Sequence, residues 1–112
     1  MTPRFPYVMM ALDDVLALYA GVSPEEPIGE PVWFGWLAVR TALDRGYEVA
    51  VLTWRDPALV HAWMDRAKLT DLYQHDGFMV TRDHPIGRPA LWCVNRVDLE
   101  GLAMLPNRKV SR

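Results

Sequence analysis

Polar side chains that could bind a ligand lie at the ends of three of the apolar runs that are typical of strands. Asp13 and Asp14 follow the first run, Thr53 and Arg55 follow the second, and Asn95 follows the last. Carboxylate oxygens suit a divalent cation, and an arginine offers a planar fork of donors that suits phosphate oxygens. We therefore look for the chemistry of this chain where its strands end.

The pattern that positions these residues alternates strand and helix. Pro31 is expected in the first turn of the first helix, and Asp56 is expected to cap the second. The expected strands are Tyr7–Leu12, Glu48–Thr53, Gly77–Thr81 and Ala90–Val94, and the expected helices are Pro31–Asp44 and 57–68. This alternation predicts an α/β fold, Rossmann-like, with a mainly parallel sheet and right-handed crossovers. Ligands in such sheets bind at the carboxyl ends of the strands.

The first expected helix is apolar around much of its circumference. One stripe, at helical spacing, is expected to face the core: Val32, Trp36, Val39 and Leu43. Three further apolar residues lie beyond that stripe: Trp33, Phe34 and Leu37. Either other parts of the same chain cover these outer residues, or a partner protein does. A homodimer that buries the three outer residues is one form of the second alternative.

Length, composition and charge limit which classes of protein this chain can belong to. The chain has 112 residues, 51% of them hydrophobic and 23% charged, which suits one domain, 1–112, with a flexible tail at 105–112. No apolar run approaches the ~18 residues of a membrane span. A net charge of −2 makes nucleic acid an unlikely partner. The single cysteine, Cys93, lies in an apolar run, and the N-terminal residues show no signal-peptide pattern, so we expect a cytoplasmic location.

Four short motifs, in order, resemble those of the haloacid dehalogenase (HAD) superfamily of phosphohydrolases. They are Ala11-Leu12-Asp13-Asp14-Val15-Leu16, Val51-Leu52-Thr53-Trp54-Arg55, Arg88-Pro89 and Val94-Asn95-Arg96-Val97-Asp98. The likeness extends from about Pro6 to Gly101. It implies a HAD-like three-layer sandwich whose first strand is central. The interval between the first two motifs is too short for an inserted cap domain.

The motifs depart from the family at the positions that carry its chemistry. The residue that matches the family's nucleophilic aspartate is Ala11, and a methyl group cannot attack phosphorus. The family's metal carboxylate in the fourth motif is replaced by Asn95, and Arg96 adds a positive charge beside it. The resemblance with these losses implies no catalytic residues and no bound Mg²⁺.

Other family positions keep residues suited to a ligand. Asp13 matches the acid–base aspartate, Thr53 the hydroxyl that contacts phosphate, and Arg88 replaces the family's lysine. A site that still binds an anion would use these side chains: Asp13, Thr53, Trp54, Arg55, Arg88 and Arg96. The alternative is a site closed by a salt bridge between Asp13 and Arg96.

Three functions follow as expectations. The first is a catalytically inactive HAD-like module that binds a phosphorylated ligand or a protein partner. The second is a residual phosphohydrolase or phosphotransferase that uses Asp13. The third is a structural homodimer or assembly protein. His61 and Asp65, four residues apart on a helix, lack a third metal ligand and are expected to be a surface pair.

Overall fold

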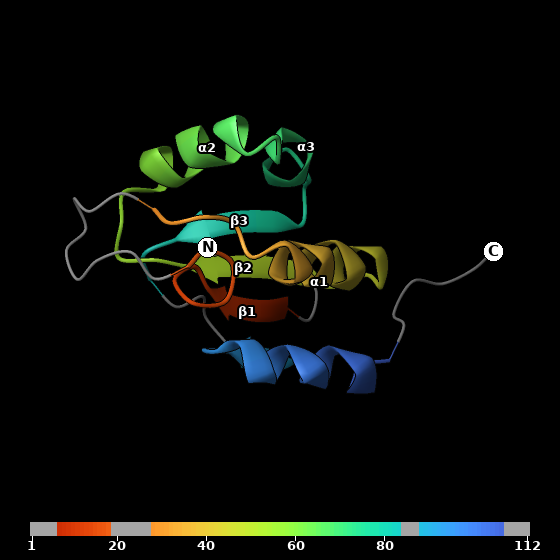
Figure 1. Ribbon diagram of the computed structural model, residues 1–112. Helices are drawn as coiled ribbons and strands as arrows, with labels where there is room; N and C mark the ends of the chain where they lie inside the picture. The colour runs from red at the N-terminus through yellow and green to blue at the C-terminus, as the bar shows by residue number, and fades with distance from the viewer. Residues whose placement is uncertain (1–6, 19–27, 84–87, 107–112) are drawn as a thin grey trace.

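A four-stranded parallel sheet lies at the centre of the computed structural model, which describes residues 7–18, 28–83 and 88–106 (Figure 1). Its strands are β1 (Tyr7–Ala11), β2 (Glu48–Leu52), β3 (Phe78–Thr81) and β4 (Leu91–Cys93), in the order β3-β2-β1-β4. β1 pairs with both β2 and β4, so the first strand is interior, as predicted. The architecture is a small, compact α/β fold consistent with a Rossmann-like arrangement.

Two α-helices and a short helical turn follow the strands. They are α1 (Trp33–Asp44), α2 (Pro57–Arg66) and α3 (Thr70–Tyr73). The Asp56 carboxylate accepts a hydrogen bond from the Ala58 amide and Pro57 is the first helical residue, so the start of α2 is confirmed. The prediction that Pro31 lies in the first turn of α1 is wrong. Pro31 instead forms an isolated antiparallel bridge with Ala17, so the helix begins two residues later.

A 3₁₀ helix, η1 (Arg96–Met104), was not expected from the sequence. The Arg45 guanidinium at the end of α1 donates to the carbonyls of Leu102 and Leu105, at 2.7 and 3.3 Å. The Tyr47 hydroxyl donates to the carbonyl of Pro106. These bonds tie the end of η1 to the end of α1, and residues 107–112 of the expected flexible tail lie outside the described residues.

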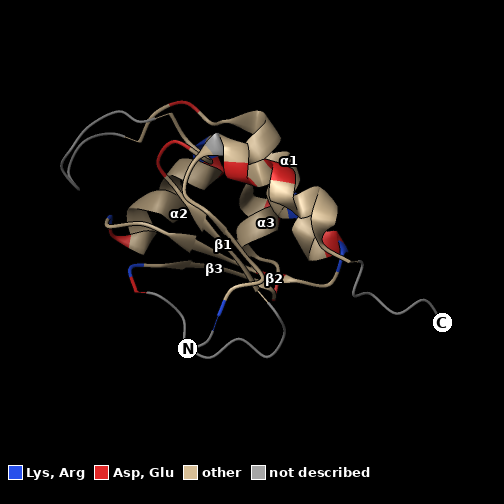
Figure 2. Cartoon of the chain, turned by 90° about the horizontal axis from the view of Figure 1, so that it is seen from below, with Lys and Arg blue, Asp and Glu red and all other residues tan. Residues whose placement is uncertain are grey.

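The described helices all lie over one face of the sheet (Figure 2). Trp36 of α1, Val60 of α2, Leu72 of α3 and Leu99 of η1 share one core cluster with alternate residues of every strand. The described chain therefore has two layers where three were expected. The reason lies in the connections: β1 to β2 and β2 to β3 step in the same direction, so right-handed crossovers place both helical segments on the same side.

The stripe predicted for the first helix is its buried face. Trp36 is 2% exposed, and its indole Nε1 donates to the carbonyl of Leu16 at 2.8 Å. Its ring also packs against those of Trp63 and Phe78. Trp36 therefore joins α1 to the turn that follows β1.

Gly35 lets α1 approach that turn closely. An alanine Cβ there would lie 2.3 Å from the carbonyl oxygen of Val15. Glycine to alanine in a helix interior is ordinarily stabilising by about 1 kcal/mol. Here we expect the reverse, because the backbone must shift: Gly35→Ala should lower the free energy of unfolding by about 1–3 kcal/mol in urea denaturation. A gain in stability would contradict this close contact.

Apolar side chains remain exposed on α1 and η1. Trp33, Phe34 and Leu37 are 59%, 53% and 63% exposed, and Val97 of η1 is 71% exposed. The described residues therefore do not cover the outer face of α1. None of the helices in the described ranges has the length and apolarity to span a bilayer.

Candidate functional site

The turn after β1 sends its two aspartates in different directions. The Leu12 carbonyl accepts hydrogen bonds from the amides of Leu16 and Ala17, which closes the turn tightly. Asp14 has a φ of 74°, in the left-handed region that aspartate tolerates better than most residues, and it is exposed. Asp13 is 9% exposed and faces the interior. Only Asp13 is therefore available to a buried site.

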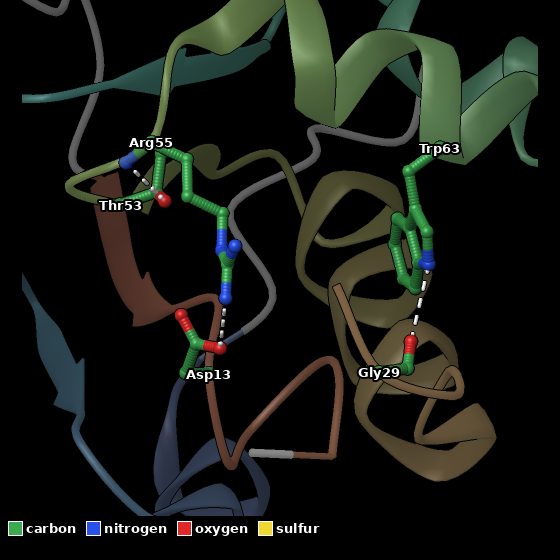
Figure 3. Close-up of polar contacts among 5 residues, drawn as sticks. All are labelled: Asp13, Gly29, Thr53, Arg55 and Trp63. Carbon is green, nitrogen blue, oxygen red and sulfur yellow. Dashed lines mark hydrogen bonds and ion pairs between the residues drawn. The ribbon is translucent and has the colours of Figure 1, made fainter. Parts of the chain in front are cut away.

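The residues after β2 bring a cation to Asp13 (Figure 3). The Thr53 hydroxyl accepts a hydrogen bond from the Arg55 amide at 3.0 Å, which turns the chain back on itself. Nη2 of Arg55 then lies 3.3 Å from Oδ1 of Asp13. The two side chains are 1% and 6% exposed, so this is a buried ion pair between the ends of two adjacent strands.

The pair leaves one carboxylate oxygen unbonded. Oδ2 of Asp13 is buried and accepts no hydrogen bond from any residue that the structure describes. A buried acceptor without a donor costs about 1–3 kcal/mol of stability. Such atoms are rare in folded proteins, and in many of them a ligand or water supplies the donor. Asp13 is therefore both held in place and short of one hydrogen bond.

A pocket of about 320 Å³ opens at this end of the sheet. Its size lies near the lower end of the range for small-molecule sites. It is lined by residues that follow, or end, each of the four strands: Ala11, Leu12, Asp13, Leu52, Thr53, Trp54, Arg82, Trp92 and Val94. The structure thus brings together three of the expected ligand-binding residues, Asp13, Thr53 and Trp54, while Arg55 lies behind them in the ion pair.

One arginine of the expected site, Arg88, does not join the described wall of this pocket. Arg88 is exposed and is not among the described residues that line the pocket. Arg82, which follows β3, lines it instead, and Nη2 of Arg82 lies 3.5 Å from the carbonyl oxygen of Trp54. The position of Arg82 directly after an apolar run was the signal that could have identified it. The side chain of Arg96 lies outside the described residues, and the described partner of Asp13 is Arg55.

Asn95 caps a helix. Its side-chain oxygen accepts hydrogen bonds from the amides of Val97 and Asp98, and the Asp98 carboxylate accepts one from the amide of Asn95. This reciprocal pair is a capping box at the start of η1. Asn95 is exposed and does not line the described pocket, so Asn95 and Asp98 of this motif bind backbone amides at the start of η1.

His61 and Asp65 have structural partners. The His61 ring packs on Tyr73, with 4.9 Å between ring centroids. Asp65 accepts hydrogen bonds from the hydroxyls of Thr70 and Tyr73, at 2.8 Å each. Those bonds lower the pKa of Asp65 and raise the pKa of Tyr73. Within the described residues, no three histidine, cysteine, aspartate or glutamate side chains form a group that could hold a metal ion.

Cys93 is buried at the end of β4, and burial, with a smaller effect of the Asp98 carboxylate, raises its pKa to about 11. Only about one thiol in a thousand is then ionised at pH 8, so we expect iodoacetamide to leave the folded protein unlabelled. Because the folded pKa exceeds the reference value of 9.0, stability should fall as the pH rises from 9.0 through about 11. Mass spectrometry with and without urea checks the labelling, and rapid labelling of the folded protein would contradict it.

The site therefore combines a fixed carboxylate, a hydroxyl, two indoles and a cation at the rim of a small pocket. No protein-family model matches the chain, and neither the curated proteins nor the solved structures contain a significant match. The chemistry of the pocket is accordingly argued from its own residues.

Proposed function

We propose that this protein is a catalytically inactive HAD-like domain that binds a small phosphorylated ligand in the pocket at the carboxyl ends of β1 and β2. The observation that carries the proposal is the buried ion pair between Asp13 and Arg55, beside Ala11 at the position of the family's nucleophile. The Arg55 guanidinium engages Oδ1 of the Asp13 carboxylate, so this side chain already has a structural role in the fold. Ala11 offers no nucleophile at the position that the family uses for attack on phosphorus, so the proposed role of the pocket is binding.

The same residues do not fit Mg²⁺. Ala11 offers no oxygen from its side chain, and one oxygen of the Asp13 carboxylate is already engaged by Arg55. A hard cation needs several oxygen ligands, of which carboxylates are the strongest, and the guanidinium repels it. We therefore expect a ligand without a divalent cation.

Arg82 supports a phosphorylated ligand. Its exposed guanidinium lies at the pocket wall, where it can form paired hydrogen bonds with phosphate oxygens. The Asp13 charge, which would repel an anion, is balanced by Arg55. Among the described residues that line the pocket, Arg82 supplies the remaining positive charge.

A thermal-shift series tests this function. Orthophosphate, sugar phosphates and nucleoside monophosphates are added to the full chain with and without Mg²⁺. A ligand at 100 times its Kd should stabilise the fold by about 2.7 kcal/mol, and Mg²⁺ should add nothing. Arg82→Ala should abolish the shift, whereas the matched control Arg88→Ala should retain it.

Catalysis is tested on the same samples. Phosphate release from the ligands that bind should stay at background with Mg²⁺ present. Turnover that Asp13→Asn abolishes would overturn the proposal in favour of a residual phosphohydrolase. A thermal shift that survives Arg82→Ala would show that the phosphate does not bind at this pocket.

A second candidate function is self-association through α1. The exposed residues Phe34, Leu37 and Val97 border a groove of about 580 Å³ between α1 and η1. A homodimer would bury this face. Light scattering should then show a dimer that Leu37→Asp converts to a monomer, and a strict monomer at high concentration would eliminate this candidate.

A further inference from the structure

A second pocket lies between the start of α1 and the end of α2, and it shares no described lining residue with the pocket at the strand ends. Its volume is about 630 Å³, within the range of small-molecule sites. We propose that this second pocket binds a flat organic anion, such as an aromatic carboxylate. The inference does not rest on the proposed phosphate site, because the two pockets use different residues.

Two indoles form the aromatic part of the second pocket. Trp63 is 6% exposed, and its Nε1 donates to the carbonyl of Gly29 at 3.1 Å, which fixes the ring against the segment before α1 (Figure 3). Trp33, the first residue of α1, is 59% exposed, so much of its ring is uncovered. A fixed indole beside an uncovered one favours a flat, apolar ring that can stack on an indole face.

The rim of the second pocket carries more positive than negative charge. Arg66 and Lys68 line it at the end of α2, and Glu30 lines it in the segment before α1. All three residues are exposed, and no ion pair within the described ranges involves either cation. Two cations against one carboxylate attract an anion, and a guanidinium can hold a carboxylate through paired hydrogen bonds. The ligand therefore combines a flat ring with a carboxylate.

The backbone of Lys68 points to a role for its side chain. Its φ is 62°, in the left-handed region, where glycine is the usual residue just after a helix ends. The amide of Leu69 donates to the carbonyl of Met64 at 2.8 Å, in the turn that ends α2. A lysine at this point strains the fold where a glycine would not, and strained residues concentrate at functional sites. Ligand binding and stability should therefore make opposite demands on Lys68.

Lys68→Gly tests these opposite demands in one variant. We expect its Tm to rise by about 2–5 °C, because the left-handed residue no longer carries a Cβ. We expect its affinity for 2-naphthoate to fall about tenfold or more, because a charge-assisted hydrogen bond is lost. A chemical-shift titration of the full chain measures the affinity, and the indole N–H resonances of Trp33 and Trp63 report the place of binding.

Matched controls separate the charge from the ring. 2-Naphthamide has the shape of 2-naphthoate without its charge, and we expect it to bind about tenfold or more weakly. Glu30→Gln should strengthen the binding of 2-naphthoate, because it removes the one negative charge among the described lining residues. Arg82→Ala, which removes a cation from the pocket at the strand ends, should leave the affinity for 2-naphthoate unchanged.

Three results would overturn the inference. Equal affinity for 2-naphthoate and 2-naphthamide would show that charge is not recognised. Full affinity in Lys68→Gly would show that the lysine side chain does not contact the anion. Indole resonances of Trp33 and Trp63 that do not move with about 10 mM 2-naphthoate would show that the ring does not bind between them.

Discussion

Replacing Arg55 with methionine is expected to lower the free energy of unfolding by about 3–5 kcal/mol, because Asp13 would stay buried without its ionic partner. The arginine side chain is 1% exposed, so water cannot replace it. The corresponding fall in Tm should exceed 10 °C at about 4 °C or more per kcal/mol. Urea denaturation followed by tryptophan fluorescence measures the change.

A double-mutant cycle separates the pair from the size of the side chains. Asp13→Val combined with Arg55→Met removes both charges, and we expect this double variant to recover most of the stability that either single variant loses. Arg40→Met is the matched control, since its ion pair with Asp71 is 2.9 Å long but lies at the surface and should contribute less than about 1 kcal/mol. Equal losses for Arg55→Met and Arg40→Met would contradict the buried pair.

Trp36→Ala is expected to cost about 3–5 kcal/mol, the usual loss for a large aromatic side chain removed from a core. The indole is 2% exposed, packs against Trp63 and Phe78, and donates to the Leu16 carbonyl. That carbonyl belongs to the turn that orients Asp13, so the variant should also weaken any ligand bound in the pocket.

The control for this prediction lies on the same helix. Trp33 is 59% exposed, and Trp33→Ala should change the free energy of unfolding by no more than about 0.5 kcal/mol. Both variants are measured by urea denaturation with circular dichroism as the readout. Similar losses at the two positions would mean that α1 packs through a different face.

Local sequence signals predicted much of the fold because they act over short distances. The apolar run at Tyr7–Leu12 became β1, and Asp56 and Pro57 capped α2 as their types require. The 3₁₀ helix η1 escaped prediction because its apolar residues give no clear helical period. Its start could have been inferred from Asn95 and Asp98, which are spaced as a capping box.

The site was predicted in part for the same reason. Parallel strands bring their carboxyl ends to one edge, so Asp13 and Thr53 were expected to lie near each other, and they line one pocket. The ionic partner of Asp13 depends on the direction of the Arg55 side chain in the turn after β2. The order of residues along the chain does not determine that direction. From the sequence, Arg96 was named as a partner for Asp13 and Arg55 was not considered for this role, although Arg55 forms the described ion pair. Arg88 and Arg82 differ in which loop reaches the pocket.

The order of the strands also sets the order in which the chain can assemble during synthesis. Val8 of β1 pairs with Leu91 of β4, its neighbour on one side, 83 residues later in the chain. At about 5–20 residues per second, a ribosome needs roughly 4–17 s to cover that distance. For that time the central strand has one open edge, although it can already pair with β2. The nascent chain must therefore be protected at this edge until its shortest strand, only three residues long, has emerged.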